Sequence, residues 1–353
     1  MRRSTATERA RQAIGRLPAW GAPWPVVAGE VIAQLRRVVG FDSFCASQND
    51  PRTAIPAAAL ADNDAISGRQ RLFWQIEMQR PDVNKTGDLV RASCPAAVLS
   101  AATGGDLARS ARWDELLRPG GIGDELRVAL VADGRWWGSV SLYRERQARW
   151  FTSGDAAAVA GLAGPIATLA RASWTAGRGG PGPGEDPPGT VLVTDDGREV
   201  TATSAARHWL DRLDPVQRAS GTLIYALVAR LGAVRAPYGR ADSVRSLVRA
   251  VDGGWIELDA SGLESPAGAG SIAITVQAAS PAAVTELLMD AFALTARERQ
   301  VAGLALAGRS TGQIGAELFL SRHTAADHLK AIFAKTGVHT RAELAQRLAG
   351  PPG

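Results

Sequence analysis

The feature that most constrains this chain is a segment that neither a helix nor a strand can contain. Residues 175–189 read TAGRGGPGPGEDPPG, and ten of these 15 residues are glycine or proline. Glycine loses much conformational freedom on folding, and proline cannot donate a backbone hydrogen bond. The segment therefore predicts a linker. Since 353 residues also suggest two or three domains at about 150 residues each, we expect separately folded parts on its two sides.

The part before the linker alternates between helical and strand patterns. Apolar residues recur at helical spacing from Val26 to Gly40, and FDSFCAS follows with the alternation of a strand. Two apolar runs further on are joined by Asp133-Gly134, a dipeptide that favours a type I′ hairpin. A helix from Ser153 to Ala172 closes this part. We expect an α+β domain over residues 22–174, with residues 1–21 as an N-terminal extension.

A second, smaller α+β domain is expected over residues 190–282. TVLVTDDGREVTATS reads as two strands around an Asp-Gly turn, and the helical SAARHWLDRL follows it. Two more strands flank Asp252-Gly253-Gly254, and Ser271–Ala279 is the last strand. The sequence contains no internal repeat. From Thr285 onward only helices are predicted, which places the final domain at residues 283–353.

Four capping signatures mark helix starts in this final domain. In each, a Ser or Thr side chain can accept a hydrogen bond from the backbone N–H of the third residue after it. The polar side chain of that third residue can in turn bond the backbone N–H of the Ser or Thr. The pairs are Thr295–Glu298, Ser310–Gln313, Ser321–Thr324 and Thr340–Glu343. The third is the weakest, because threonine reaches back poorly. Helical spacing then predicts that the apolar faces of the four helices form one shared core. Its side chains are those of Val301, Leu304, Ala305, Ile314, Leu318, Leu329, Ile332, Phe333, Leu344 and Leu348.

The second and third of these helices are joined by a very short connection at Phe319 and Leu320, as a helix-turn-helix requires. Residues 295–349 hold eight basic and four acidic residues, a net charge of +4, whereas the rest of the chain has +1. Such a concentration of charge favours binding to phosphates. The alternative is a helical module that docks on a protein and has a solvated basic face. On the side away from the core the third helix presents His323, Ala326, Asp327 and Lys330.

The C-terminal sequence resembles the LuxR-type, or GerE-type, helix-turn-helix of bacterial transcriptional regulators. The matching residues are Leu294-Thr295 with Arg297-Glu298, Gly308, Ile314, the Leu318-x-Leu320-Ser321 junction, Thr324 with His328, and Lys335-x-Gly337-Val338 followed by Thr340-Arg341. In this family the third helix enters the major groove, the second helix and the turn touch the DNA backbone, and the fourth helix often forms the dimer contact. The resemblance implies DNA contacts by Ser310, Thr311, Arg322, His323, Thr324, Ala326, Asp327, Lys330, Lys335 and Arg341.

Three positions depart from the family's pattern. Gly315 replaces the usual alanine and Ala325 the usual valine, so we expect looser packing between the second and third helices. Ala326 stands where the family often has Lys or Gln, which removes a long side chain from the groove and weakens the carry-over of the family's base contacts, so the operator cannot be read from relatives. The spacing of His328 favours the edge of the core. Asp327 is equally compatible with accepting from a cytosine and with solubilising the helix.

The two domains before this module resemble sensor domains. FDSFCASQNDPRT, IGDELRVALVADGRWWGSVSLYRE and FTSGDAAAVAGLAGPIATLAR are similar to a GAF domain of the kind that actinobacterial regulators carry, and residues 190–280 are similar to a PAS domain. Both folds commonly hold a small ligand beneath helices. For Cys94 we expect a buried apolar position rather than a reactive thiol. Large aromatic residues are usually ordinary core, but four are candidates for lining such a pocket: Trp74, Trp113, Trp136 and Trp137.

Other classes of function find no support in the sequence. No lysine follows a glycine, which excludes a P-loop, and the paired acids of a phospho-accepting receiver are missing. The N-terminus lacks the apolar core of a secretion signal, Ala156–Ala170 is too short to span a bilayer, and two cysteines do not call for a disulfide. We therefore expect a cytoplasmic protein. No metal, nucleotide or other cofactor site is expected, since ligand spacing is missing around His208, His323, His328 and His339.

These observations predict an α+β multidomain protein, with GAF-like and PAS-like antiparallel-sheet domains followed by an all-α four-helix LuxR-type helix-turn-helix. The predicted function is that of a non-enzymatic, sequence-specific transcriptional regulator, whose partners are double-stranded DNA and a second copy of the chain. RNA polymerase and a small-molecule effector are further candidate partners, and no membrane is expected. In the alternative, a sensory or scaffolding protein uses its C-terminal helices to bind a protein.

Overall fold

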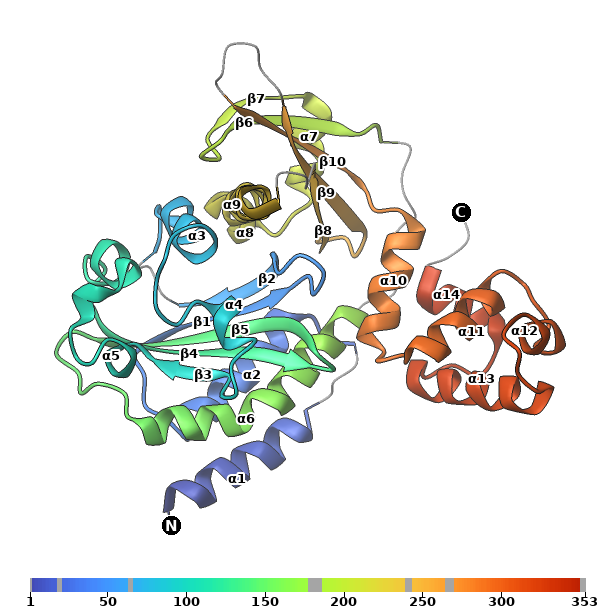
Figure 1. Cartoon of the computed structure of the whole chain (residues 1–353), viewed down its shortest axis with the longest axis horizontal. Coiled ribbons are helices and arrows are strands. Elements are labelled where there is room, and N and C mark those ends of the chain that lie inside the picture. The colour runs from blue at the N-terminus through green and yellow to red at the C-terminus, as the bar shows by residue number, and fades with distance from the viewer. Residues whose placement is uncertain are drawn as a thin grey trace.

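The computed structural model describes residues 2–17, 21–62, 66–176, 186–238, 243–263 and 270–349. It contains two five-stranded antiparallel sheets, each with its own helices, and a group of short helices at the C-terminal end (Figure 1). The predicted α+β multidomain class is confirmed. In the following we call the three parts the first sheet domain, the second sheet domain and the terminal helical domain.

The first sheet has the strand order β2-β1-β5-β4-β3. Its strands are β1 (Ser43–Asn49), β2 (Pro56–Ala61), β3 (Ala96–Val98), β4 (Ile122–Ala132) and β5 (Arg135–Glu145). The predicted hairpin joins β4 to β5. Asp133 and Gly134 have φ angles of 50° and 70°, the positive values that a type I′ turn needs.

Helices lie on both sides of this sheet (Figure 1). On one side are α2 (Trp24–Arg36), α6 (Ser153–Ala172) and, packed along α6, α1 (Arg2–Gly15). Because Ala10 and Ile14 of α1 are buried, the predicted N-terminal extension contributes to the core. The other short elements are α3 (Gln70–Met78), α4 (Thr86–Leu89), α5 (Leu99–Ala102), η1 (Leu107–Arg109), η2 (Trp113–Leu117) and η3 (Ser173–Thr175).

Among the described residues, α6 with its following turn is the one helix long and apolar enough to cross a membrane. Half of its most apolar stretch is buried within the protein, where Val159, Leu162 and Ile166 are fully covered. Thr152 caps its start by accepting from the N–H of Asp155, and Pro165 lies within the helix without ending it. These are the features of a helix that packs on a sheet.

The second sheet has the strand order β7-β6-β10-β9-β8, so both sheets follow the order 2-1-5-4-3 when strands are counted within each domain. Three helices stand between its second and third strands, and the longest of them was not predicted from the sequence. The elements are β6 (Gly189–Thr194), β7 (Glu199–Ala202), α7 (Ser204–Asp211), α8 (Pro215–Ser220), α9 (Thr222–Tyr238), β8 (Ser243–Arg249), β9 (Trp255–Leu263) and β10 (Ser271–Ala278).

The two sheet domains are in direct contact. Helix α3 packs against α9, and β2 lies beside β8 (Figure 1). The carboxylate of Asp50 accepts from the N–H of Leu247 at 3.0 Å, and the rings of Trp174 and Trp255 stack with centroids 5.8 Å apart. Of the predicted linker, residues 177–185 lie outside the described residues. Thr175 and Ala176 were expected to begin it, but both are buried against the first sheet domain.

Helix α10 (Pro281–Ala291) follows the second sheet and packs against the last helix of the chain. The predicted domain boundary at residue 283 therefore lies inside a helix. Each of the four terminal helices begins directly after its predicted cap, and the predicted core residues are buried or half-buried. These helices are α11 (Ala296–Leu306), α12 (Thr311–Glu317), α13 (Arg322–Thr336) and α14 (Arg341–Ala349).

Candidate DNA-binding face and interdomain cavity

Side-chain caps determine where α12 and α13 begin. The N–H of Gln313 donates to Ser310 Oγ at 3.3 Å, and the N–H of Ser310 donates to Gln313 Oε1 at 2.8 Å. At the next cap the N–H of Thr324 donates to Ser321 Oγ at 3.0 Å, but the Thr324 hydroxyl bonds the Ser321 hydroxyl instead of the backbone. Thr324 therefore makes no reciprocal bond to the backbone of Ser321.

Gly315 allows the turn after α12 to approach the helix closely. A Cβ at this position would lie only 2.9 Å from the carbonyl oxygen of Leu320. The N–H of Leu320 also donates to the carbonyl of Gly315 at 2.8 Å. The expectation that this glycine loosens the packing is therefore wrong, because the missing side chain brings the turn nearer to α12.

The outer face of α13 points to solvent, as predicted. Leu329 and Ile332 are buried on the opposite side of the helix. His323 lies 3.5 Å from Asp327, whereas neither Arg322 nor Lys330 forms an ion pair with a described residue. His328 is half-buried, at the edge of the core. The exposed residues of this face are Arg322, His323, Thr324, Ala326, Asp327 and Lys330.

Three of the residues expected to contact DNA, Ser310, Thr311 and Arg341, gather at the start of α12. The Arg341 guanidinium donates to the carbonyl of Arg309 and, at 3.0 Å, to Thr311 Oγ1. Ser310 is exposed beside them. Arg341 therefore ties the first turn of α14 to α12, and Ser310, Thr311 and Arg341 form one continuous polar patch next to the turn.

Lys335, which was expected to contact DNA, has its ammonium bonded within the terminal helical domain. Its Nζ lies 2.6 Å from Glu298 Oε2 and 3.1 Å from the carbonyl oxygen of Ala293. Burial by itself raises the pKa of Glu298, but the Lys335 ammonium and the N–H and hydroxyl of Thr295 hold it below the usual carboxyl range. Lys335 thus joins α13 to α11 as part of the fold.

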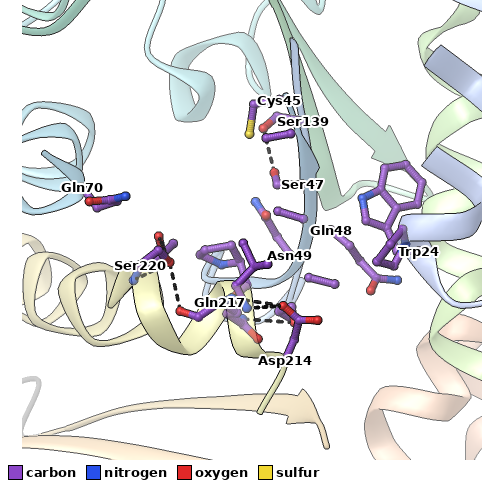
Figure 2. Close-up of a pocket in the computed structure, with 18 of the residues that line it drawn as sticks. Trp24, Cys45, Ser47, Gln48, Asn49, Gln70, Ser139, Asp214, Gln217 and Ser220 are labelled. Atoms are coloured by element: carbon purple, nitrogen blue, oxygen red, sulfur yellow. Dashed lines mark hydrogen bonds between the residues drawn. The ribbon is translucent and has the colours of Figure 1, made fainter. Parts of the chain in front are cut away.

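A cavity of about 1290 Å³ lies where the two sheet domains meet (Figure 2). Its lining comes from β1, β2, β5 and α3 of the first sheet domain and from α8, α9 and the end of β8 in the second. Cys45 and Ser139 lie on one side, and Gln217 and Ser220 of α8 lie on the other. A space of this size between two domains is suited to a small organic molecule.

Two of the four candidate tryptophans, Trp74 and Trp136, line this cavity. Trp137 is fully buried in the core, and Trp113 packs in a separate cluster, so the prediction is wrong for these two. The reason for Trp137 is geometric. Successive side chains of a strand point to opposite faces of the sheet, so Trp136 and Trp137 cannot both face the cavity.

The prediction for Cys94 is wrong, and the other cysteine, Cys45, lies at the cavity. Cys94 is exposed rather than buried, because it lies in the irregular segment before β3, whereas Cys45 is half-buried and lines the cavity. Burial raises the pKa of Cys45 to about 11, although the nearby Arg127 opposes this. The thiol is therefore protonated at neutral pH. Among the described residues no three His, Cys, Asp or Glu side chains gather into a group that could hold a metal ion.

A buried ion cluster, which was not predicted from the sequence, contributes to the wall of the cavity. Arg112 lies 3.1 Å from Asp82 and 2.8 Å from Glu125, and Arg127 lies 2.8 Å from Glu77. Burial raises the pKa of Glu77, but the two guanidinium groups outweigh it and hold the pKa below its usual value. Arg127 and Glu77 also line the cavity. The signal that could have revealed the cluster is the presence of three charges, Asp124, Glu125 and Arg127, inside a strand that is otherwise largely apolar.

Comparison with known proteins gives one family and several distant structures. The family described as bacterial regulatory proteins, luxR family, matches residues 293–348. None of the curated proteins matches the chain. The VqmA dimer of Vibrio cholerae, a LuxR-type receptor solved without its target DNA, shares 18% identity with a TM-score of 0.23 over 46% of this chain and 82% of that one.

Two bacteriophytochrome structures from R. palustris are also similar. The chromophore-binding domain of RpBphP3 shares 13% identity with a TM-score of 0.31, over 46% of this chain and 58% of that one. A longer structure of the same protein shares 11% identity with a TM-score of 0.31, over 78% and 62%. Since all these TM-scores are low, the assignment rests on the family match. Residues 293–348 are a LuxR-family helix-turn-helix domain at the end of an α+β multidomain chain.

Proposed function

We propose that this protein is a sequence-specific transcriptional regulator that binds a two-fold DNA site as a dimer, and that its two sheet domains respond to a signal. The observation that carries the proposal is the outer face of α13, where Arg322 and Lys330 are exposed without acidic partners among the described residues of a LuxR-family domain. We further propose a cytoplasmic protein without enzymatic activity, whose other partners are RNA polymerase and a small-molecule effector.

The test is the selection of bound duplexes from a random pool by the full-length protein. A dimeric regulator is expected to enrich an inverted repeat whose half-sites lie about one helical turn, or a multiple of it, apart. Binding should also weaken steeply as the salt concentration rises, because phosphate contacts release counterions. If the terminal helices instead dock on a protein, no sequence is enriched and the proposal fails.

Helix α10 offers a route by which the sheet domains influence the terminal helices. Its buried Asp290 carboxylate lies 2.9 Å from Arg135 of β5 and also contacts Arg299 of α11. Burial raises the pKa of Asp290, and the two guanidinium groups only partly oppose this. Arg135 directly precedes Trp136, which lines the cavity. One carboxylate therefore joins a strand of the cavity wall to the DNA-binding domain.

Replacing Asp290 by asparagine is expected to weaken the docking of the terminal helices on the first sheet domain. We expect a loss of about 1–2 kcal/mol, a small value because both arginines are roughly a third exposed. Calorimetry should then resolve a separate, earlier unfolding transition of the terminal helices. Asp259→Asn, at the pair with the exposed Arg245, is the matched control. Identical thermograms for the two variants would show that Asp290 does not connect the domains.

A further inference from the structure

The charged side chains that line the interdomain cavity are matched by partners, with one exception. Asp214 caps α8 by accepting from the N–H groups of Val216 and Gln217. Four others form ion pairs: Arg127 pairs with Glu77, Arg71 with Asp196, and Asp62 with Arg36. The exception is Arg249, at the end of β8.

Arg249 has no carboxylate partner among the described residues. Its Nη1 donates to the carbonyl of Gly253 at 3.0 Å and its Nη2 to the carbonyl of Trp174 at 3.4 Å. The guanidinium carbon also lies 4.2 Å from the centre of the Trp255 ring. These neutral contacts hold the side chain in place but do not balance its charge. Burial lowers the pKa of Arg249 to about 10, which reflects the cost of keeping an uncompensated cation there.

Two more polar atoms in the cavity lining are buried without a hydrogen-bond partner among the described residues. They are the indole Nε1 of Trp174, a donor, and the amide oxygen of Asn49. Buried polar groups are normally satisfied, so unpaired ones indicate a missing partner. The lining as a whole is mainly apolar and includes Trp24 and Ala57. The region thus combines an unbalanced cation with apolar walls.

We propose that this cavity binds a small organic anion, with its carboxylate or phosphate group against Arg249 and its apolar body against the tryptophan and alanine side chains. A charge-assisted bond to a guanidinium is stronger than a neutral one, and its planar donors match either anion. Arg249 belongs to the second sheet domain and Trp174 to the first, so the occupant contacts both. The proposal rests on signal sensing by the sheet domains, but it does not depend on DNA binding.

The test uses two dyes that fluoresce in apolar sites and differ in charge. The anionic probe is 8-anilinonaphthalene-1-sulfonate and the neutral probe is N-phenyl-1-naphthylamine, each titrated into the full-length protein at fixed salt. Arg249→Gln is expected to weaken binding of the anionic dye about 10- to 100-fold and to leave the neutral dye nearly unchanged. Arg245→Gln is the matched control, because Arg245 lies on the same strand, is exposed and pairs with Asp259.

Competition experiments on the wild-type protein provide a second test, which does not require Arg249→Gln to fold. Benzoate and phenyl phosphate should displace the anionic dye, and benzyl alcohol should not. The stronger of the two competitors tells whether the site prefers a carboxylate or a phosphate. Equal binding of the anionic dye by the wild type and a folded Arg249→Gln, or displacement by benzyl alcohol as strong as by benzoate, would overturn the proposal. Either result leaves the DNA-binding function untouched.

Discussion

Lys330→Glu is expected to weaken binding of the full-length protein to its selected duplex about 10- to 100-fold, with no loss of folding stability. Lys330 is exposed in the middle of the outer face of α13 and forms no ion pair with a described residue. Its ammonium is therefore free to reach a phosphate or a base edge. The substitution also places a negative charge against the DNA. Fluorescence anisotropy of a labelled duplex over a range of salt concentrations measures both the affinity and its salt dependence.

Lys335 on the same helix provides the contrasting variant. Because its ammonium is bonded to Glu298, Lys335→Met is expected to lower the stability of the terminal helical domain by about 1 kcal/mol and to leave the salt dependence unchanged. The pKa of Glu298 is lowered in the folded protein, so this pair stabilises above the usual carboxyl range and its contribution is lost as the pH falls. An equal decrease of the salt dependence in both variants would contradict this assignment and place Lys335 at the DNA.

The terminal helical domain could be predicted closely because its signals are local. A cap at Ser310 or Ser321 needs only residues up to three positions away, and the core face of a helix repeats within one turn. The four helix starts therefore agree with the structure. The contacts of Gly315 and Lys335 could not be predicted, and for the same reason. Each depends on a contact with another part of the domain, the turn at Leu320 for one and Glu298 for the other.

The interdomain cavity could not be predicted, because its lining is gathered from positions far apart in the sequence. Trp24, Ser139 and Arg249 meet only when both sheets are folded and packed against each other. The sequence does show that consecutive tryptophans in a strand face opposite ways, which would have limited Trp136 and Trp137 to one cavity residue. It does not show that both sheets have the same strand order, since that similarity leaves no repeat in the residues.

The buried ion cluster should give the largest effect on stability. Arg112→Met is expected to destabilise the first sheet domain by about 3–5 kcal/mol, because it leaves the buried carboxylate of Asp82 without a cation and leaves Glu125 with only Arg127, 3.5 Å away. The Arg112 side chain is 1% exposed, and the side chains of Asp82 and Glu125 that it contacts are fully buried. Urea unfolding at neutral pH measures the loss. Arg118→Met is the control, because Arg118 pairs with Asp114 on the surface at 2.7 Å and should cost less than about 1 kcal/mol.

The pH dependence shows whether the loss in Arg112→Met comes from unpaired charge or from lost packing. A buried carboxylate without a cation takes up a proton more readily, so the folded variant should gain protons as the pH falls from 7 toward about 5. The destabilisation should therefore shrink toward acid. Adding Asp82→Asn and Glu125→Gln should recover much of the loss at neutral pH, because neutral amides need no cation. A penalty that is the same at every pH, and that the added substitutions do not reduce, would instead assign the role of Arg112 to packing.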